Sequence, residues 1–297
     1  KGDIQGYLCA NAMPSQARHS AMVMRVLNLE VASVRDAVRG NAMTGRLRFQ
    51  FWRDVVTAAY EVRSLHICRP PAPVHCPMQG VPHAHPLGQP LHDAVQQHRH
   101  TKRFISRMID AREDDLVNPP PMTLEDLEAY GEQTQSSLLY LGLEAVGVRD
   151  TAADHVASHV GKAAGLVLAI RSAPLHAALN QRYLPDEILR THKLSDTALF
   201  HYFPPPDKAI SDAVTGAVYD VACQAHGHLA HAVDIAGEMP PQAAAALLPA
   251  EPVVMYLKAL EEARFDPSAP QLHAKGYLKL WWRLVGHTFR GTFMDKP

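Results

Sequence analysis

The chain has 297 residues, and 29 Lys and Arg against 30 Asp and Glu give it a formal net charge of −1 at pH 7. Without excess positive charge it is not an electrostatic binder of nucleic acid, and we expect no nucleic-acid partner. Four cysteines are too few for a disulfide-built secreted scaffold of this size. The composition, 47% hydrophobic, therefore predicts a globular protein of a reducing compartment with one large domain or two small ones.

Apolar residues recur at helical spacing in the segments between clusters of proline. Residues 24–38 carry the clearest stripe, which consists of Met24, Leu27, Val31, Val34 and Val38. Further sets follow the same period: Leu47, Phe51 and Val55; Leu124, Leu127, Leu138, Leu141 and Ala145; Val156, Val160, Ala163, Val167 and Ile170. No run alternates apolar and polar residues for long enough to build a sheet. We therefore predict an all-α protein of roughly eight to ten helices, and a single domain over residues 1–297 because no low-complexity linker divides the chain.

Residues 66–100 concentrate histidine, cysteine and proline, and thiolates and imidazoles are ligands of zinc. Structural zinc sites usually pair ligands two to four residues apart, whereas Cys68 and Cys76 are eight apart. The pattern favours an irregular, solvent-facing connection over residues 66–90 and no metal, with Cys68, His75 and Cys76 as the weak alternative. His155 and His159, four residues apart on a predicted helix, can also bind a metal, although packed or capping histidines are commoner.

Several familiar catalytic motifs are absent from the sequence. It has no Gly-rich phosphate loop, no Gly-x-Ser-x-Gly elbow and no His-Glu-x-x-His. An all-α enzyme that ionises prenyl diphosphates needs carboxylates at i, i+3 or i+4 on two facing helices, because they hold the Mg²⁺ ions that neutralise the diphosphate. Whether the chain can be such an enzyme therefore depends on whether its helices carry carboxylates at these spacings.

Segments spread along the chain resemble the squalene and phytoene synthase superfamily. Residues 26–36 and 45–53 resemble its opening, and Tyr183-Leu184-Pro185, Phe265-Asp266-Pro267 and Leu280-Trp281-Trp282 follow in order. Residues 134–141, 153–163, 171–176 and 223–229 resemble one branch, the mitochondrial complex I assembly factor 6 family. The resemblance implies an isoprenoid-synthase-like helical bundle around a central cavity, surrounded by helices that carry Val31, Leu138, Val160, Val167 and Val218.

The resemblance also places the two metal-binding motifs of active relatives. The first falls at residues 32–36, where Ala32 and Ser33 carry no carboxylate and only Asp36 does. The second falls at residues 172–176, where Ser172 and His176 stand at the carboxylate positions. Mg²⁺ is poorly held by such a set. We expect no cofactor and a catalytically inactive pseudoenzyme, and an active Mg²⁺-dependent prenyl diphosphate transferase is the disfavoured alternative.

Other residues of the same region are candidates for a remnant site. Gln135 and Leu139 stand where active relatives carry small residues, which predicts a smaller cavity. Arg35, Arg48 and Arg171 are candidate contacts for an anion or a lipid headgroup.

The resemblance implies a role in the biogenesis of mitochondrial respiratory complex I by protein binding, on the matrix side of the inner membrane with peripheral membrane association. The alternative is a permanent accessory subunit of a large mitochondrial assembly, either a respiratory complex or the mitochondrial ribosome. In the amphipathic C-terminal segment, Trp281, Trp282 and Arg283 are candidate contacts with a partner or a membrane. Alternatively, Leu280, Trp281 and Leu284 pack the last helix onto the core.

Overall fold

The computed structural model describes residues 3–38, 41–61, 85–118, 122–200, 208–273 and 276–297. Within these ranges the regular structure is helical and contains no strand, which confirms the predicted all-α class. The helices are α1 (Ile4–Ala12), α2 (Ser15–Val38), α3 (Ala42–Tyr60), α4 (Gly88–His98), α5 (Lys102–Val117), α6 (Leu124–Gly131), η2 (Glu132–Ser136), α7 (Ser137–Ala145), α8 (Thr151–Ala178), α9 (Asp186–Thr191), α10 (Asp196–Phe200), α11 (Lys208–Ile235), η3 (Ala236–Glu238), η4 (Pro241–Ala243), α12 (Ala244–Leu247), α13 (Ala250–Glu262), η5 (Pro270–His273) and α14 (Tyr277–Arg290).

The described part of the chain thus holds fourteen α-helices, more than the predicted eight to ten. Short helices account for most of the difference, since α9, α10 and α12 have six, five and four residues. A helix of one or two turns is too short to show a periodic apolar pattern.

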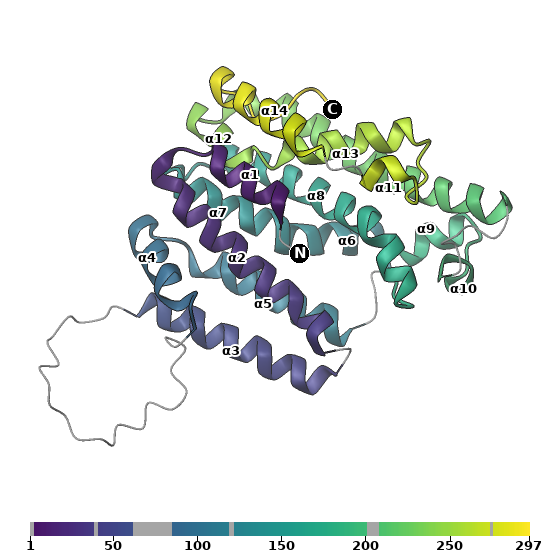
Figure 1. Ribbon diagram of the computed structural model, residues 1–297, viewed down its shortest axis with the longest axis horizontal. Helices are drawn as coiled ribbons and strands as arrows, with labels where there is room; N and C mark the ends of the chain where they lie inside the picture. Colours follow the sequence, from purple (N-terminus) through teal and green to yellow (C-terminus); the bar gives the residue numbers. More distant parts are fainter. Residues whose placement is uncertain (1–2, 39–40, 62–84, 119–121, 201–207, 274–275) are drawn as a thin grey trace, which may run out of the picture.

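The long helices α8 and α11 pack against each other and carry the larger of the apolar cores, to which α13 also contributes (Figure 1). A second core lies among α2, α3, α4 and α5, and α1 packs against α14 near the C-terminus. The predicted stripes on α2 and α8 are buried at every position. Burial of these stripes is what holds the helices together, at about 25 cal/mol per Å² of apolar surface.

The apolar stripe predicted for α3 is not the face that the structure buries. Leu47 and Phe51 are 66% and 41% exposed, so two of the three residues in the predicted stripe do not face the core. The buried face carries Phe49, Trp52 and Val56 instead. Both stripes have helical spacing, and the choice between them is made by α4 and α5, which pack on α3.

The helix that spans α6 and α7 is interrupted by a five-residue π-helical segment, η2. It starts at a capping box, in which Thr123 and Asp126 bond each other's backbone, as these residue types at this spacing predict. Glycines let η2 and α6 approach α8 closely. A Cβ on Gly165 would lie 2.6 Å from the Cα of Gly131, and one on Gly161 would lie 2.4 Å from the backbone nitrogen of Ser136.

The predicted irregular connection over residues 66–90 lies for the most part outside the described residues, as do Cys68, His75 and Cys76. Its described end differs from the prediction, because α4 begins at Gly88. Pro90 is tolerated there, since the first turn of a helix does not use its backbone N–H groups.

Glu144 is a buried carboxylate at the end of α7. It accepts hydrogen bonds from the backbone N–H of Thr101 (2.8 Å) and from Arg149 (2.8 Å), and His100 lies 3.1 Å away. Burial alone would raise the pKa of Glu144, but these partners lower it below its ordinary value. The network fixes the junction between α4, α5 and α7.

We expect Glu144→Gln to lower the free energy of unfolding at pH 7 by about 2 kcal/mol, because a charge-assisted hydrogen-bond network is lost. The unfolded carboxyl titrates near pH 4.3 and the folded one lower, so its contribution is complete above that value and disappears as the pH falls through the folded pKa. The wild-type and variant urea midpoints should therefore converge in acid. A constant difference from pH 7 down to pH 3 would contradict this assignment. The exposed Glu125→Gln is the control.

Among the described residues, no single helix has the length and hydropathy of a membrane span. One bent pair, Pro241–Leu247 with Ala250–Glu262 at 56°, meets the criteria of length and composition when the two are taken together.

Candidate functional site

A cavity of about 150 Å³ lies between α2, α5, α6, η2 and α8. Its walls include Ala32 and Asp36 from the first motif region and Ser172 and His176 from the second, together with the predicted narrowing residue Gln135. Residues about 140 positions apart in the chain thus meet at one place. Ligand pockets for small molecules usually measure about 300–1,000 Å³, so this space is smaller than such sites.

The helices predicted to surround the cavity border it in part. α2, which carries Val31, and α8, which carries Val160 and Val167, contribute to its walls. α7 with Leu138 and α11 with Val218 do not, and Leu139 is buried in the larger core.

Arg35 is one of two arginines in the cavity walls. Its Nη1 lies 2.6 Å from the Oδ2 of Asp115 on α5 and also donates to the Asp115 backbone carbonyl at 3.0 Å. The Tyr183 hydroxyl donates to the same Oδ2 at 2.9 Å, and the Arg35 guanidinium lies 5.0 Å from the centre of the Tyr183 ring. Burial alone would lower the pKa of Arg35, but Asp115 raises it above its ordinary value. The three side chains form a closed ion-pair cluster.

The second motif region makes local contacts. The Ser172 hydroxyl donates to the backbone carbonyl of Leu168 at 2.7 Å, and the His176 ring lies 4.3 Å from the Tyr183 ring. Burial lowers the pKa of His176, and the charge of Arg35 lowers it further. α8 continues through Pro174, which separates these two residues. The lowered pKa favours a neutral His176 ring, which lies tilted against Tyr183 beside the ion pair.

These residues do not fit the Mg²⁺ ions that the synthase resemblance implies. The described walls hold two carboxylates, Asp36 and Asp115, and two guanidinium groups, Arg35 and Arg112. Asp115 is already paired, and Ser33 bonds the backbone carbonyl of Glu30 rather than facing the cavity. Mg²⁺ requires several oxygen ligands in octahedral geometry. Walls with equal numbers of carboxylate and guanidinium groups do not provide these oxygen ligands.

Of the three candidate anion contacts, only Arg35 lines the cavity. Arg48 is exposed on α3, and Arg171 donates to the side chain of Gln5 at 2.7 Å. The structure therefore brings only Arg35 to the cavity, and a contact of Arg48 or Arg171 with an anion or a lipid headgroup stays a prediction. The sequence analysis missed Asp115 and Arg112, which no motif marks.

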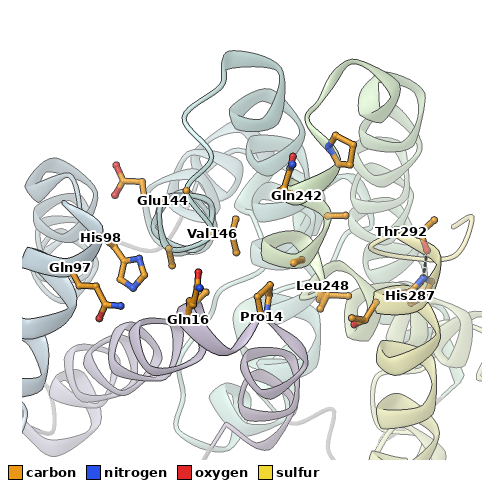
Figure 2. Close-up of a pocket in the computed structure, with 18 residues that line it drawn as sticks. Pro14, Gln16, Gln97, His98, Glu144, Val146, Gln242, Leu248, His287 and Thr292 are labelled. Atoms are coloured by element: carbon orange, nitrogen blue, oxygen red, sulfur yellow. Dashed lines mark hydrogen bonds between the residues drawn. The ribbon is translucent and has the colours of Figure 1, made fainter.

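A second concave surface is an open groove of about 760 Å³, where the ends of several helices meet. Figure 2 shows Gln16 at the start of α2, Gln97 and His98 at the end of α4, and Gln242 and His287 across the groove. The Nε2 atom of His98 is buried and has no hydrogen-bond partner among the residues that the structure describes. The groove combines amide and imidazole groups from α2, α4, η4 and α14, so no local sequence pattern could have identified it.

The three residues of α14 predicted to contact a partner or a membrane differ in their exposure to solvent. Trp282 is 67% exposed, Trp281 is half-buried, and Leu280 and Leu284 are buried against the protein. Arg283 is not a free surface cation, since it pairs with the buried Glu251 and with Asp295. Of the candidates for an external contact, the structure leaves Trp282 clearly available.

The helical bundle and the cavity between α2 and α8 define a protein of the squalene/phytoene synthase class, and the chain belongs to that family, whose model matches residues 1–281. A dehydrosqualene synthase crystal structure superposes with a TM-score of 0.72 at 14% identity, covering 97% of this chain and 91% of that one. Squalene synthase HpnC from Alicyclobacillus acidocaldarius superposes with a TM-score of 0.59 at 14% identity, over 87% and 99% of the two chains. These two likenesses establish the fold.

Within this class the chain belongs to the complex I assembly factor 6 family, which confirms the resemblance found in the sequence. "NADH dehydrogenase (ubiquinone) complex I, assembly factor 6" is 37% identical in Rattus norvegicus and 36% identical in Homo sapiens, in each case over 94% of this chain and 76% of the relative. The Drosophila melanogaster homolog is 32% identical over 89% of this chain and 74% of the relative.

Proposed function

We propose that this protein acts in the assembly of mitochondrial respiratory complex I, by binding other proteins and without catalysing prenyl transfer. The names of relatives that match 94% of the chain support the assembly role. The Arg35–Asp115 ion pair is the main support for the absence of catalysis. It holds a positive charge in the cavity next to Asp36, where active relatives would bind Mg²⁺. The open groove offers polar groups on a surface large enough for a segment of a partner.

The cavity argues against a bound prenyl diphosphate on grounds of charge as well as size. A diphosphate carries several negative charges, and transferring it into a low-dielectric space is strongly unfavourable unless cations compensate. Arg35 is paired with Asp115, and the charge of the buried Arg112 is offset by that of Asp36. The cavity walls therefore carry no net positive charge to compensate this substrate.

We expect purified protein with Mg²⁺ to release no pyrophosphate from farnesyl or geranylgeranyl diphosphate, and Asp36→Ala to behave in the same way. A coupled pyrophosphate assay measures both proteins, with an active squalene synthase as the positive control. Turnover that Asp36→Ala abolishes would contradict the non-catalytic proposal.

We further propose that α14 attaches the protein peripherally to the matrix face of the inner membrane. Leu278, Trp282 and Phe289 are 71%, 67% and 88% exposed. Their spacings of four and seven residues place them within about 40° of one another around the helix. The sequence of α14 contains no Asp or Glu, and Lys279 and Arg290 are exposed, whereas Arg283 is paired with Glu251 and Asp295. Exposed apolar and aromatic residues beside basic ones are typical of a helix that lies on an anionic membrane.

We expect the protein to sediment with phosphatidylcholine vesicles that contain phosphatidylserine and to bind less to vesicles of phosphatidylcholine alone. Trp282→Glu should weaken the binding to the anionic vesicles about tenfold, because it removes the burial of one large apolar side chain. Leu47→Glu, at an exposed position on α3, is the matched control. Equal losses in the two variants, or no binding by the wild type, would refute the role of α14.

Native gel electrophoresis of solubilised mitochondria separates an assembly factor from a permanent subunit. We expect the protein to migrate with partly assembled forms of complex I and to be absent from the mature complex. Retention in the mature complex at stoichiometric amounts would instead support the accessory-subunit alternative.

A further inference from the structure

Three histidines from two helices converge outside the set of residues that line the cavity. His155 and His159 lie one turn apart on α8, and His231 lies on α11, which packs along α8 (Figure 1). One ring nitrogen from each of the three lies within 4.8 Å of the other two. The Nε2 atoms of His155 and His159 are 3.2 Å apart, and the His159 and His231 rings are 4.4 Å apart. His155 and His231 are exposed, so solvent reaches the site.

This spacing suits one small metal ion. Zn–N bonds of about 2.0–2.1 Å in tetrahedral geometry place neighbouring ligand nitrogens about 3.3 Å apart. The His155–His159 separation is already close to that value, and small rotations of the exposed His231 side chain can bring its nitrogen to the same centre. A hydrogen bond satisfies only two nitrogens at a time, whereas a metal ion engages three.

A buried relay orients the central ligand. The Nδ1 of His159 lies 2.9 Å from the Nδ1 of the buried His228, whose Nε2 lies 3.2 Å from the Oε1 of Glu128 on α6. That Nε2 is buried and is not aligned for a hydrogen bond with any described group. The carboxylate favours the proton on the Nε2 of His228, so its Nδ1 accepts from the Nδ1–H of His159. The lone pair of His159 Nε2 is then directed toward His155 and His231, which is the orientation that a metal ligand needs.

We propose that His155, His159 and His231 form a site for a divalent transition metal of the zinc class, with His228 and Glu128 as the groups that orient His159. Three imidazoles select zinc and its neighbours over Mg²⁺ and Ca²⁺, which prefer oxygen ligands. The fourth coordination position faces solvent, where water or a side chain of a partner can complete the shell. The bound ion clamps α8 to α11.

The test uses the full chain without an affinity tag. We expect one Zn²⁺ per chain to bind at this site in calorimetry, and Co²⁺ to give the visible absorption of a tetrahedral complex. His155→Ala and His231→Ala should each weaken binding at least about 100-fold, and Glu128→Gln about 10-fold. His226→Ala is the matched control, because His226 is exposed on α11 but outside the cluster. Circular dichroism confirms that each variant is folded.

Several results would overturn the proposal. Binding that survives both His155→Ala and His231→Ala places the metal elsewhere. Loss of binding in Cys76→Ser with normal binding in the cluster variants assigns it to the cysteine- and histidine-rich stretch. Equal weakening in His226→Ala and His231→Ala indicates nonspecific surface binding, and no binding by the wild type removes the site altogether.

Discussion

Replacing Gly161 by alanine is expected to lower the free energy of unfolding by about 3 kcal/mol. The new Cβ would lie 2.4 Å from the backbone nitrogen of Ser136 and 2.5 Å from its Cα, closer than atoms of this kind approach. Because the obstruction is backbone, η2 would have to move away from α8. Urea unfolding followed by circular dichroism measures the difference.

Gly227→Ala is the matched control, since Gly227 lies within the long helix α11 and a Cβ there meets nothing within 4 Å. Alanine has the higher helix propensity, so this variant should be more stable than the wild type by about 0.5–1 kcal/mol. Two variants of the same chemical change should therefore shift stability in opposite directions. If both stabilise the protein, the close approach of η2 to α8 is wrong.

Replacing Glu251 by alanine is expected to cost about 3–5 kcal/mol, the range observed when one partner of a buried ion pair is removed. Glu251 is fully buried and pairs with Arg283, while the Nε2 of His287 lies 3.0 Å and the backbone nitrogen of Asp295 3.1 Å from its Oε2. One carboxylate thus connects α13, α14 and the C-terminal segment. Thermal unfolding should show a large fall in Tm.

Arg190→Ala provides the comparison for Glu251, because the Arg190–Asp186 ion pair involves an arginine that is 76% exposed. Its loss should change stability by no more than about 1 kcal/mol. Similar effects of the two substitutions would mean that the Glu251 network is hydrated rather than buried.

The sequence predicted the helices best where one face is buried along the whole length. The α2 and α8 stripes are such cases, since every predicted position is buried. α3 carries two apolar stripes, and the buried one depends on helices that are distant in sequence. The π-helical segment η2 could not be predicted from its own residues either, and Gly161, against which it packs closely, lies on α8, further along the chain.

At the cavity, sequence comparison could indicate Ala32, Asp36, Ser172 and His176 because they stand at motif positions. It could not indicate Asp115, which follows two other acidic residues on α5. Helical geometry turns the three side chains in different directions: Glu113 pairs with Arg53, Asp114 is exposed, and Asp115 meets Arg35. Only the tertiary structure distinguishes them.

Complementation with Asp36→Ala tests the central claim most directly. Cells that lack the endogenous protein receive either wild-type protein or this variant, at matched levels, and mature complex I is quantified on native gels. Asp36 is exposed at the cavity, so the substitution should leave the fold intact. A protein that acts by binding, without metal-dependent prenyl transfer, predicts equal restoration of complex I by the two proteins. Failure of the folded Asp36→Ala protein to restore it, while the wild type succeeds, would contradict the account.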